Sequence, residues 1–231
     1  MHESWTLDEL AHAGPEHLDD AFVAGYDRKQ AFDPAEDLAV LRAHGLDSNA
    51  ILLDLGAGTG RLALAAALAC RTVVAVDVSP VMLRFLRDQA ARAGLTNVEC
   101  VQAGFLSYEH RGPPVDLAYT RNALHQLPDF WKAIALERIA RILRPRGVLR
   151  LHDLIFDFQP AEAGGVLGRW LDGAALDPER GYTREDFAEH IRSEHSTFRW
   201  LFEPMLAAAG FEVAGADFRR GVYGAYTCVK R

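Results

Sequence analysis

The chain of 231 residues contains only three cysteines and no long uncharged hydrophobic run. Cys70, Cys100 and Cys228 form neither a CxxC pair nor an even set, which excludes a secreted disulfide scaffold and predicts reduced, mostly buried thiols. No uncharged run approaches the ~18 residues of a membrane span, and the N-terminus lacks the basic segment and apolar core of a signal peptide. We therefore expect a cytoplasmic protein with no membrane association.

An excess of basic charge is also missing. The chain has 25 Lys and Arg against 32 Asp and Glu, a formal net charge of -7. This balance gives no global attraction to nucleic acid or acidic membranes, so nucleic acid is not an expected partner. A content of 49% hydrophobic and 25% charged residues is typical of a soluble globular protein.

From residue 50 onward, short apolar runs alternate with longer helical patterns, as in βαβ units with a mainly parallel sheet. The short link between the last two apolar runs indicates an antiparallel hairpin at a sheet edge. We predict an α/β protein with a Rossmann-like, doubly wound sheet of seven mostly parallel strands. The expected strands cover residues 50–55, 72–77, 98–102, 115–119, 148–154, 211–216 and 222–229.

We expect a single domain, because single α/β domains often reach this length. Residues 1–48 look helical and are predicted to form a lid, and residues 49–156 form the core of the sheet. Residues 157–195 contain a Gly- and Pro-bearing stretch and then a helix from Thr183 to Glu194, so we interpret them as an inserted cap. Residues 196–231 complete the domain with a helix and the strand hairpin.

The most informative motif is the glycine-rich turn from Asp54 to Gly60, which follows the first expected strand. In a doubly wound sheet, ligands bind beyond the carboxyl ends of the strands. Glycines let the backbone approach a ligand closely, and the following helix N-terminus offers free amides to an anion. Taken alone, the turn also fits a tight strand-to-helix connection with no ligand.

Two details narrow the choice of ligand. The spacing is GxGxG rather than the GxGxxG of dinucleotide sites. Asp77 ends the second strand, where a carboxylate can accept hydrogen bonds from both ribose hydroxyls, although nicotinamide enzymes place an acid there too.

The stretch from Ile51 to Leu64, together with Val73 to Asp77, resembles the class I S-adenosylmethionine-dependent methyltransferases, especially their small-molecule branch. Residues 114–119, 122–127 and 143–147 resemble that family's fourth-strand motif and the segment after it, so the likeness covers about residues 50–155. The resemblance implies S-adenosyl-L-methionine as cofactor and transfer of its methyl group to a small-molecule acceptor by in-line displacement.

Carried onto this chain, the family pattern implies that the glycine turn contacts the methionine part of the cofactor, Asp77 the ribose, and Val78 with Met82 one face of the adenine. Many members have an acid after the third strand that accepts a hydrogen bond from the adenine amino group. Gly104 stands there in this chain, so backbone carbonyls, Gln102 or another group must replace it. The implied cofactor-binding residues are Asp54, Gly56, Ala57, Gly58, Gly60, Asp77, Val78, Met82, Gly104, Phe105, Arg121, Asn122 and the aromatic lid residue Tyr26.

His125 follows the fourth strand and is the candidate catalytic residue, since it could take a proton from a hydroxyl or amine. It could equally pack in its loop or touch the cofactor. His152 and Asp153 end the fifth strand. The spacing of five between His190 and His195 does not align them on one helix face, so no metal site is expected.

The expected cap and the helix after it contain residues that could contact a substrate. Their arginines could bind a substrate carboxylate, or they could lie on solvated helix faces. Their aromatic side chains could be core or substrate wall. These residues are Arg184, Arg192, Arg199, Trp170, Phe198, Trp200 and Phe202.

Two other functions fit the same features, namely methylation of a tRNA base and cofactor binding without catalysis. The sequence does not identify the acceptor, the atom that is methylated or the oligomeric state.

Overall fold

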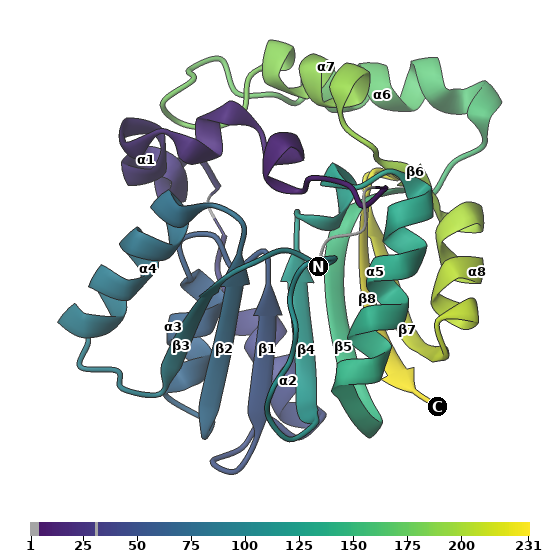
Figure 1. The fold of residues 1–231 in the computed structure, drawn as a ribbon. Helices are drawn as coiled ribbons and strands as arrows, with labels where there is room; N and C mark the ends of the chain where they lie inside the picture. Colours follow the sequence, from purple (N-terminus) through teal and green to yellow (C-terminus); the bar gives the residue numbers. More distant parts are fainter. Residues whose placement is uncertain (1–4, 31) are drawn as a thin grey trace.

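The computed structural model describes residues 5–30 and 32–231, so residues 1–4 and 31 of the expected lid lie outside the described part. Helices pack on both sides of a central sheet (Figure 1). The strands are β1 (Ile51–Leu55), β2 (Thr72–Asp77), β3 (Val98–Gln102), β4 (Val115–Arg121), β5 (Leu143–Phe156), β6 (Thr197–Phe198), β7 (Phe211–Arg219) and β8 (Tyr223–Lys230). The α-helices are α1 (Asp20–Gln30), α2 (Ala35–Ala43), α3 (Arg61–Ala67), α4 (Pro80–Arg92), α5 (Asp129–Ile142), α6 (Ala163–Asp172), α7 (Arg184–Ser193) and α8 (Arg199–Ala208). Short 3-10 helices are η1 (Leu10–His12), η2 (Pro15–Leu18), η3 (Leu124–Gln126) and η4 (Pro160–Glu162).

The sheet has the order β3-β2-β1-β4-β5-β8-β7. Strands β1 to β5 pair in parallel, whereas β8 runs antiparallel to both β5 and β7. This confirms the predicted Rossmann-like sheet with an antiparallel C-terminal hairpin. Every residue of β1 is buried, as its continuous apolar run indicated for a strand covered on both faces.

The structure adds an eighth strand, an earlier start of β5 and a helix in the cap to the expected elements. Strand β6 pairs with the end of β5 as an eighth strand, and its two residues are too few to show a period. Strand β5 begins at Leu143 rather than at residue 148, because Leu143 pairs with Val115 across a register shift. The cap contains helix α6, which the sequence pattern did not reveal because glycines interrupt its apolar residues.

The hydrophobic core lies on both faces of the sheet. Helices α5 and α8 cover one face, whereas α2, α3 and α4 cover the other. A third cluster lies under the cap, where Trp170 is fully buried and stacks on Phe187 with ring centroids 4.3 Å apart. Trp170 and the buried Phe202 are therefore core residues, whereas Trp200 is 52% exposed.

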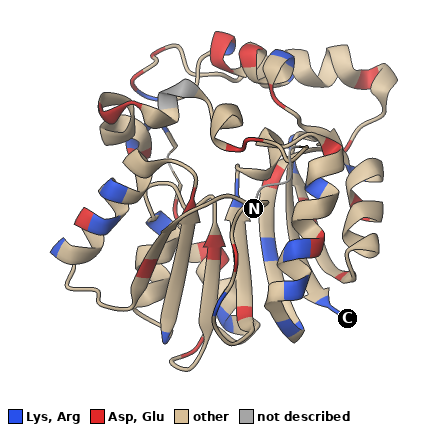
Figure 2. Ribbon diagram, viewed as in Figure 1, with Lys and Arg blue, Asp and Glu red and all other residues tan. Residues whose placement is uncertain are grey.

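Helix α1 and the cap helices α6 and α7 lie over the carboxyl ends of the parallel strands (Figure 1). Acidic and basic residues lie beside one another on both the sheet layer and this covering layer (Figure 2). No helix in the described ranges has both the length and the apolarity needed to cross a membrane. The loops that follow β1, β2 and β4 thus face a covered edge of the sheet.

Candidate functional site

The glycine turn after β1 is shaped by three left-handed residues, with φ of 71° at Gly56, 53° at Gly58 and 86° at Gly60. A Cβ added to Gly56 would overlap Ala123, whereas one added to Gly58 would enter open space, 4.0 Å from Tyr26 Cε1. Gly60 is the N-cap of α3, and a Cβ there would overlap Leu86. Gly60 therefore serves close packing and does not line the cavity, in contrast to the sequence-based expectation.

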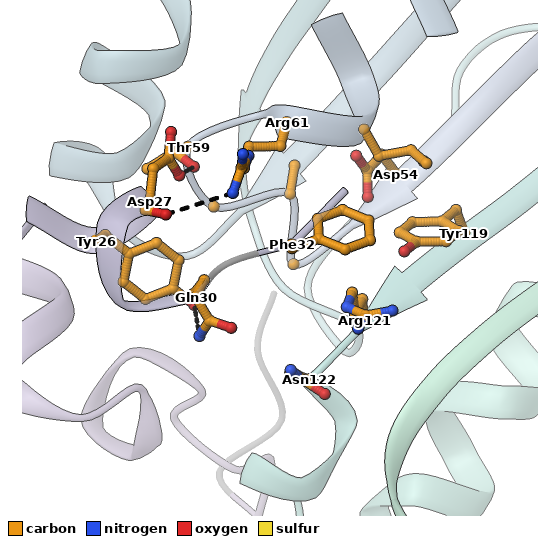
Figure 3. A pocket seen from close by; sticks show the side chains of 14 residues that line it. Tyr26, Asp27, Gln30, Phe32, Asp54, Thr59, Arg61, Tyr119, Arg121 and Asn122 are labelled. Carbon is orange, nitrogen blue, oxygen red and sulfur yellow. Dashed lines mark hydrogen bonds between the residues drawn. The ribbon is translucent and has the colours of Figure 1, made fainter. Parts of the chain in front are cut away.

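A cavity in two adjoining parts opens along this turn. The first part is enclosed by lid residues, the glycine turn and the end of β4 (Figure 3). The second part continues past Asp77 to Met82 and to the loop after β3. Apart from Gly60, the structure brings all of the predicted cofactor-binding residues together around this cavity.

Two buried carboxylates lie at the centre of the cavity. Asp77 accepts hydrogen bonds of 2.8 Å from the backbone N–H groups of Gly58 and Ser79, which fix its orientation. Asp54 is 1% exposed, and its Oδ2 has no hydrogen-bond partner among the described residues. Burial, and then the nearby charge of Asp77, raises the pKa of Asp54 to about 8. Asp54 therefore offers an unsatisfied acceptor to a cationic ligand.

We expect Asp54→Asn to stabilise the ligand-free protein at alkaline pH. The pKa of Asp54 is about 8 in the folded chain against an ordinary 3.8, so the folded state retains a proton that the unfolded state loses above pH 4. As the pH rises from the ordinary pKa of 3.8 to the folded-state pKa of about 8, the free energy of unfolding therefore falls by up to about 1.4 kcal/mol per pH unit. Asparagine does not ionise, so the variant does not lose this stability. Thermal melts at pH 4 and pH 8.5 should show a gain in Tm of several degrees only at the higher pH. The exposed Asp88→Asn is the matched control, and an equal gain at both pH values would contradict the prediction.

A carboxylate that the sequence did not single out links the lid to the sheet. Asp37 of α2 is buried and accepts hydrogen bonds from Tyr119 Oη at 2.8 Å, Arg150 Nε at 2.9 Å and His152 Nε2 at 2.5 Å. Burial tends to raise the pKa of Asp37, but its bonds to His152 and Arg150 hold it well below the ordinary value.

The same carboxylate also positions a residue of the cavity wall. Asp37 lies 3.5 Å from Arg121, whose guanidinium packs 4.2 Å from the ring centroid of Phe32. Arg121 and Phe32 both line the cavity (Figure 3). Asp37 therefore joins α2 to residues that shape this part of the site.

A second unforeseen carboxylate lies beside Gly104. Glu9 is 9% exposed, and its carboxylate accepts hydrogen bonds from Leu106 N at 3.0 Å, Ser107 N at 3.1 Å and Ser107 Oγ at 2.9 Å. A Cβ on Gly104 would overlap this carboxylate. The absence of a side chain at position 104 thus makes room for an acid from the N-terminal segment, and Glu9 lines the cavity.

His125, the candidate base, is 6% exposed and does not line the cavity. Its Nδ1 lies 2.5 Å from Asp153 Oδ1, and its Nε2 lies 2.9 Å from Glu194 Oε2. Burial lowers the pKa of His125, but Asp153 and Glu194 outweigh burial and raise it to about 10. In this arrangement His125 keeps its proton at neutral pH, so the expected role as general base would require Glu194 to withdraw.

The candidate substrate-binding arginines are engaged elsewhere. Arg184 pairs with Asp172 at 2.6 Å, and Arg192 pairs with Glu185 at 2.6 Å. Arg199 pairs with Glu203 at 2.8 Å. Arg184 and Arg192 are exposed, Arg199 is half-buried, and none of the three lines the cavity.

Comparison with known proteins gives the same family as the sequence motifs. Residues 52–147 match the methyltransferase domain family. An uncharacterized methyltransferase of Anoxybacillus flavithermus is 25% identical over 206 residues, which cover 88% of this chain and 89% of that protein.

Solved structures share the fold. A SAM-dependent methyltransferase from Aquifex aeolicus superposes with a TM-score of 0.63 at 19% identity, covering 92% of this chain and 99% of that one. The magnesium protoporphyrin IX methyltransferase of Synechocystis, solved with bound SAM, has a TM-score of 0.63 at 14% identity, covering 99% and 100%. In its methyltransferase domain, its relatives and its fold, the chain is similar to the S-adenosylmethionine-dependent methyltransferases.

Proposed function

We propose that this protein transfers the methyl group of S-adenosyl-L-methionine to a small-molecule acceptor held beneath the lid and cap. The observation that carries the proposal is the unpartnered Oδ2 of Asp54 beside the open face of Gly58. S-adenosylmethionine has a sulfonium and an α-ammonium group, which suit a buried carboxylate with no other partner. When bound, it supplies an electrophilic methyl group.

The residues around the cavity fit the parts of this cofactor. Asp54 and the glycine turn would hold the methionine part, and Asp77 would accept hydrogen bonds from the ribose hydroxyls. Val78, Met82 and Phe105 would enclose the adenine, with the first two near the same end of α4. Glu9 lies beside Gly104, where many members of the family have an acid, and its carboxylate would accept a hydrogen bond from the adenine amino group.

The lid and the cap are joined above the cavity, which favours a small acceptor. Gln30 Nε2 donates hydrogen bonds to Tyr26 Oη at 2.9 Å and to Tyr182 Oη at 2.7 Å. Tyr26 belongs to α1 of the lid, and Tyr182 precedes α7 of the cap. A covered cavity of this kind would help to position the reactants, on which in-line displacement largely depends. The intermixed charges (Figure 2) and the net charge of -7 offer little attraction to tRNA.

Calorimetry with S-adenosylmethionine and S-adenosylhomocysteine tests the cofactor, and release of S-adenosylhomocysteine from pools of small molecules tests the transfer. A parallel reaction with tRNA tests the rival acceptor. Binding of both nucleosides with turnover on a small-molecule pool is the expected result. If the protein binds neither S-adenosylmethionine nor S-adenosylhomocysteine, the proposal is refuted. If it binds them but shows no turnover with any pool, a non-catalytic cofactor-binding module is favoured.

We expect Glu9→Ala to weaken S-adenosylmethionine binding about tenfold, because the adenine amino group loses a charged acceptor. The double variant Glu9→Ala/Gly104→Asp should recover part of this affinity, since removal of Glu9 frees the space for a side chain at position 104. Calorimetry on the three proteins measures the effect. Equal affinity of Glu9→Ala and the parent would exclude this role of Glu9.

A further inference from the structure

Three metal-ligating side chains meet where the cap contacts the core. His190 and Glu194 lie one helical turn apart at the end of α7, and His125 comes from η3 after β4. One ligand atom of each residue lies within 4.8 Å of the others. Glu194 Oε2 is 2.9 Å from His125 Nε2 and 2.5 Å from His190 Nδ1.

The carboxylate of Glu194 lies between the two imidazoles of this cluster. Its Oε2 is buried and has no hydrogen-bond partner of acceptable geometry among the described residues, although two imidazoles lie close to it. The contacts of 2.5 and 2.9 Å are those of imidazole–carboxylate pairs, whereas two ligands of one tetrahedral zinc ion lie about 3.3 Å apart. Glu194 must therefore move outward by less than about 1 Å to admit an ion between the three side chains.

We propose that His125, His190 and Glu194 bind one divalent transition-metal ion, with zinc preferred. Two imidazoles and one carboxylate form a ligand set that suits zinc and leaves a fourth tetrahedral position open. Binding displaces protons from the imidazoles, so the ion competes with an imidazolium–carboxylate network formed by the same residues.

The residues behind the cluster hold the imidazoles in the orientation that ligation requires. Asp153 Oδ1 lies 2.5 Å from His125 Nδ1, while its Oδ2 accepts a 2.8 Å hydrogen bond from Leu124 N. His190 Nε2 lies 2.7 Å from Ser196 Oγ. The remote nitrogen of each ring is therefore engaged, which leaves His125 Nε2 and His190 Nδ1 for the metal, as in carboxylate–histidine–metal arrangements.

The position of the cluster suggests what the ion does. His125 follows Ala123, which lines the cofactor cavity, so the ion would lie beside the site and join the cap to the core. Its fourth position is available to water or to a heteroatom of the acceptor. This inference revises the expectation of no metal, which considered only the spacing of His190 and His195, whereas the ligand on the same helix face is Glu194.

Zinc content and affinity of the full, untagged chain test the inference. The protein is stripped with EDTA, dialysed against zinc chloride, analysed by mass spectrometry for metal and titrated against a chromophoric chelator. We expect one zinc ion per chain, bound at least about 100-fold more weakly by Glu194→Gln and by His190→Gln. Glu189→Gln on the same helix and His110→Gln are matched controls that should bind zinc like the parent.

Absence of stoichiometric zinc in the parent, or equal affinity in the ligand variants, would overturn the inference. X-ray absorption at the zinc edge of the parent identifies two imidazoles and one carboxylate independently of whether a variant folds, and thiolate ligation would refute the site. Calorimetry with S-adenosylmethionine on the same samples separates the two proposals. A protein that binds S-adenosylmethionine but no zinc contradicts only the metal site. A protein that binds zinc but no S-adenosylmethionine contradicts only the proposed function.

Discussion

Replacing Gly58 by valine is expected to weaken S-adenosylmethionine binding at least about 100-fold, equivalent to about 2.7 kcal/mol. Gly58 lines both parts of the cavity, and the space its Cβ would enter contains no protein atom closer than Tyr26 Cε1 at 4.0 Å. A valine side chain would therefore enter space that the cofactor needs, and its Cβ meets no protein atom closer than 4.0 Å. The backbone N–H that binds Asp77 is retained. Calorimetry measures the loss.

Valine at a left-handed position also lowers the stability of the fold, and this effect must be separated from the loss of cofactor affinity. Gly58 has φ of 53°, and an L-residue there costs roughly 1–2 kcal/mol of stability. Gly94, with φ of 68° and no atom within 4 Å of an added Cβ, lies outside the cavity and provides the matched control. Gly94→Val should lose similar stability and keep the affinity of the parent. A Gly58→Val protein that still binds the cofactor normally would contradict the assignment of the glycine turn.

Removal of the carboxylate at position 37 has the largest expected effect on stability. Asp37→Ala leaves the guanidinium of Arg150, 4% exposed, buried without its charge partner. Breaking a buried pair in this way typically costs about 3–5 kcal/mol. The variant should also bind the cofactor more weakly, because Arg121 and Tyr119 lose a common partner at the cavity. Urea unfolding measures the first effect and calorimetry the second.

The double variant Asp37→Ala/Arg150→Met identifies the cause. If the orphaned charge is responsible, removing both charges should recover part of the lost stability. Glu36→Ala, at an exposed position of the same helix, controls for a change of charge on α2 and should cost little. A double variant as unstable as, or less stable than, Asp37→Ala would show that lost packing dominates.

Several features of the fold could be predicted because their signals are local. The apolar run of β1 and the short link before β8 are each encoded by neighbouring residues. The N-cap of α4 is equally local, since the side chain of Ser79 accepts a 3.1 Å hydrogen bond from Met82 N. Short or interrupted elements gave weaker signals, which is why α6 and β6 were not predicted.

The doubly wound sheet, the glycine turn and the acid that ends β2 follow from the sequence, since apolar periodicity and turn chemistry act between residues a few positions apart. The three-dimensional packing was needed to show that Glu9 occupies the space left by Gly104, that Asp37 joins α2 to β4 and β5, and that Glu194 contacts His125. Each of these contacts joins a carboxylate to residues far away along the chain. Their distances are fixed by how lid, sheet and cap pack together, and no local pattern of residues reports that packing.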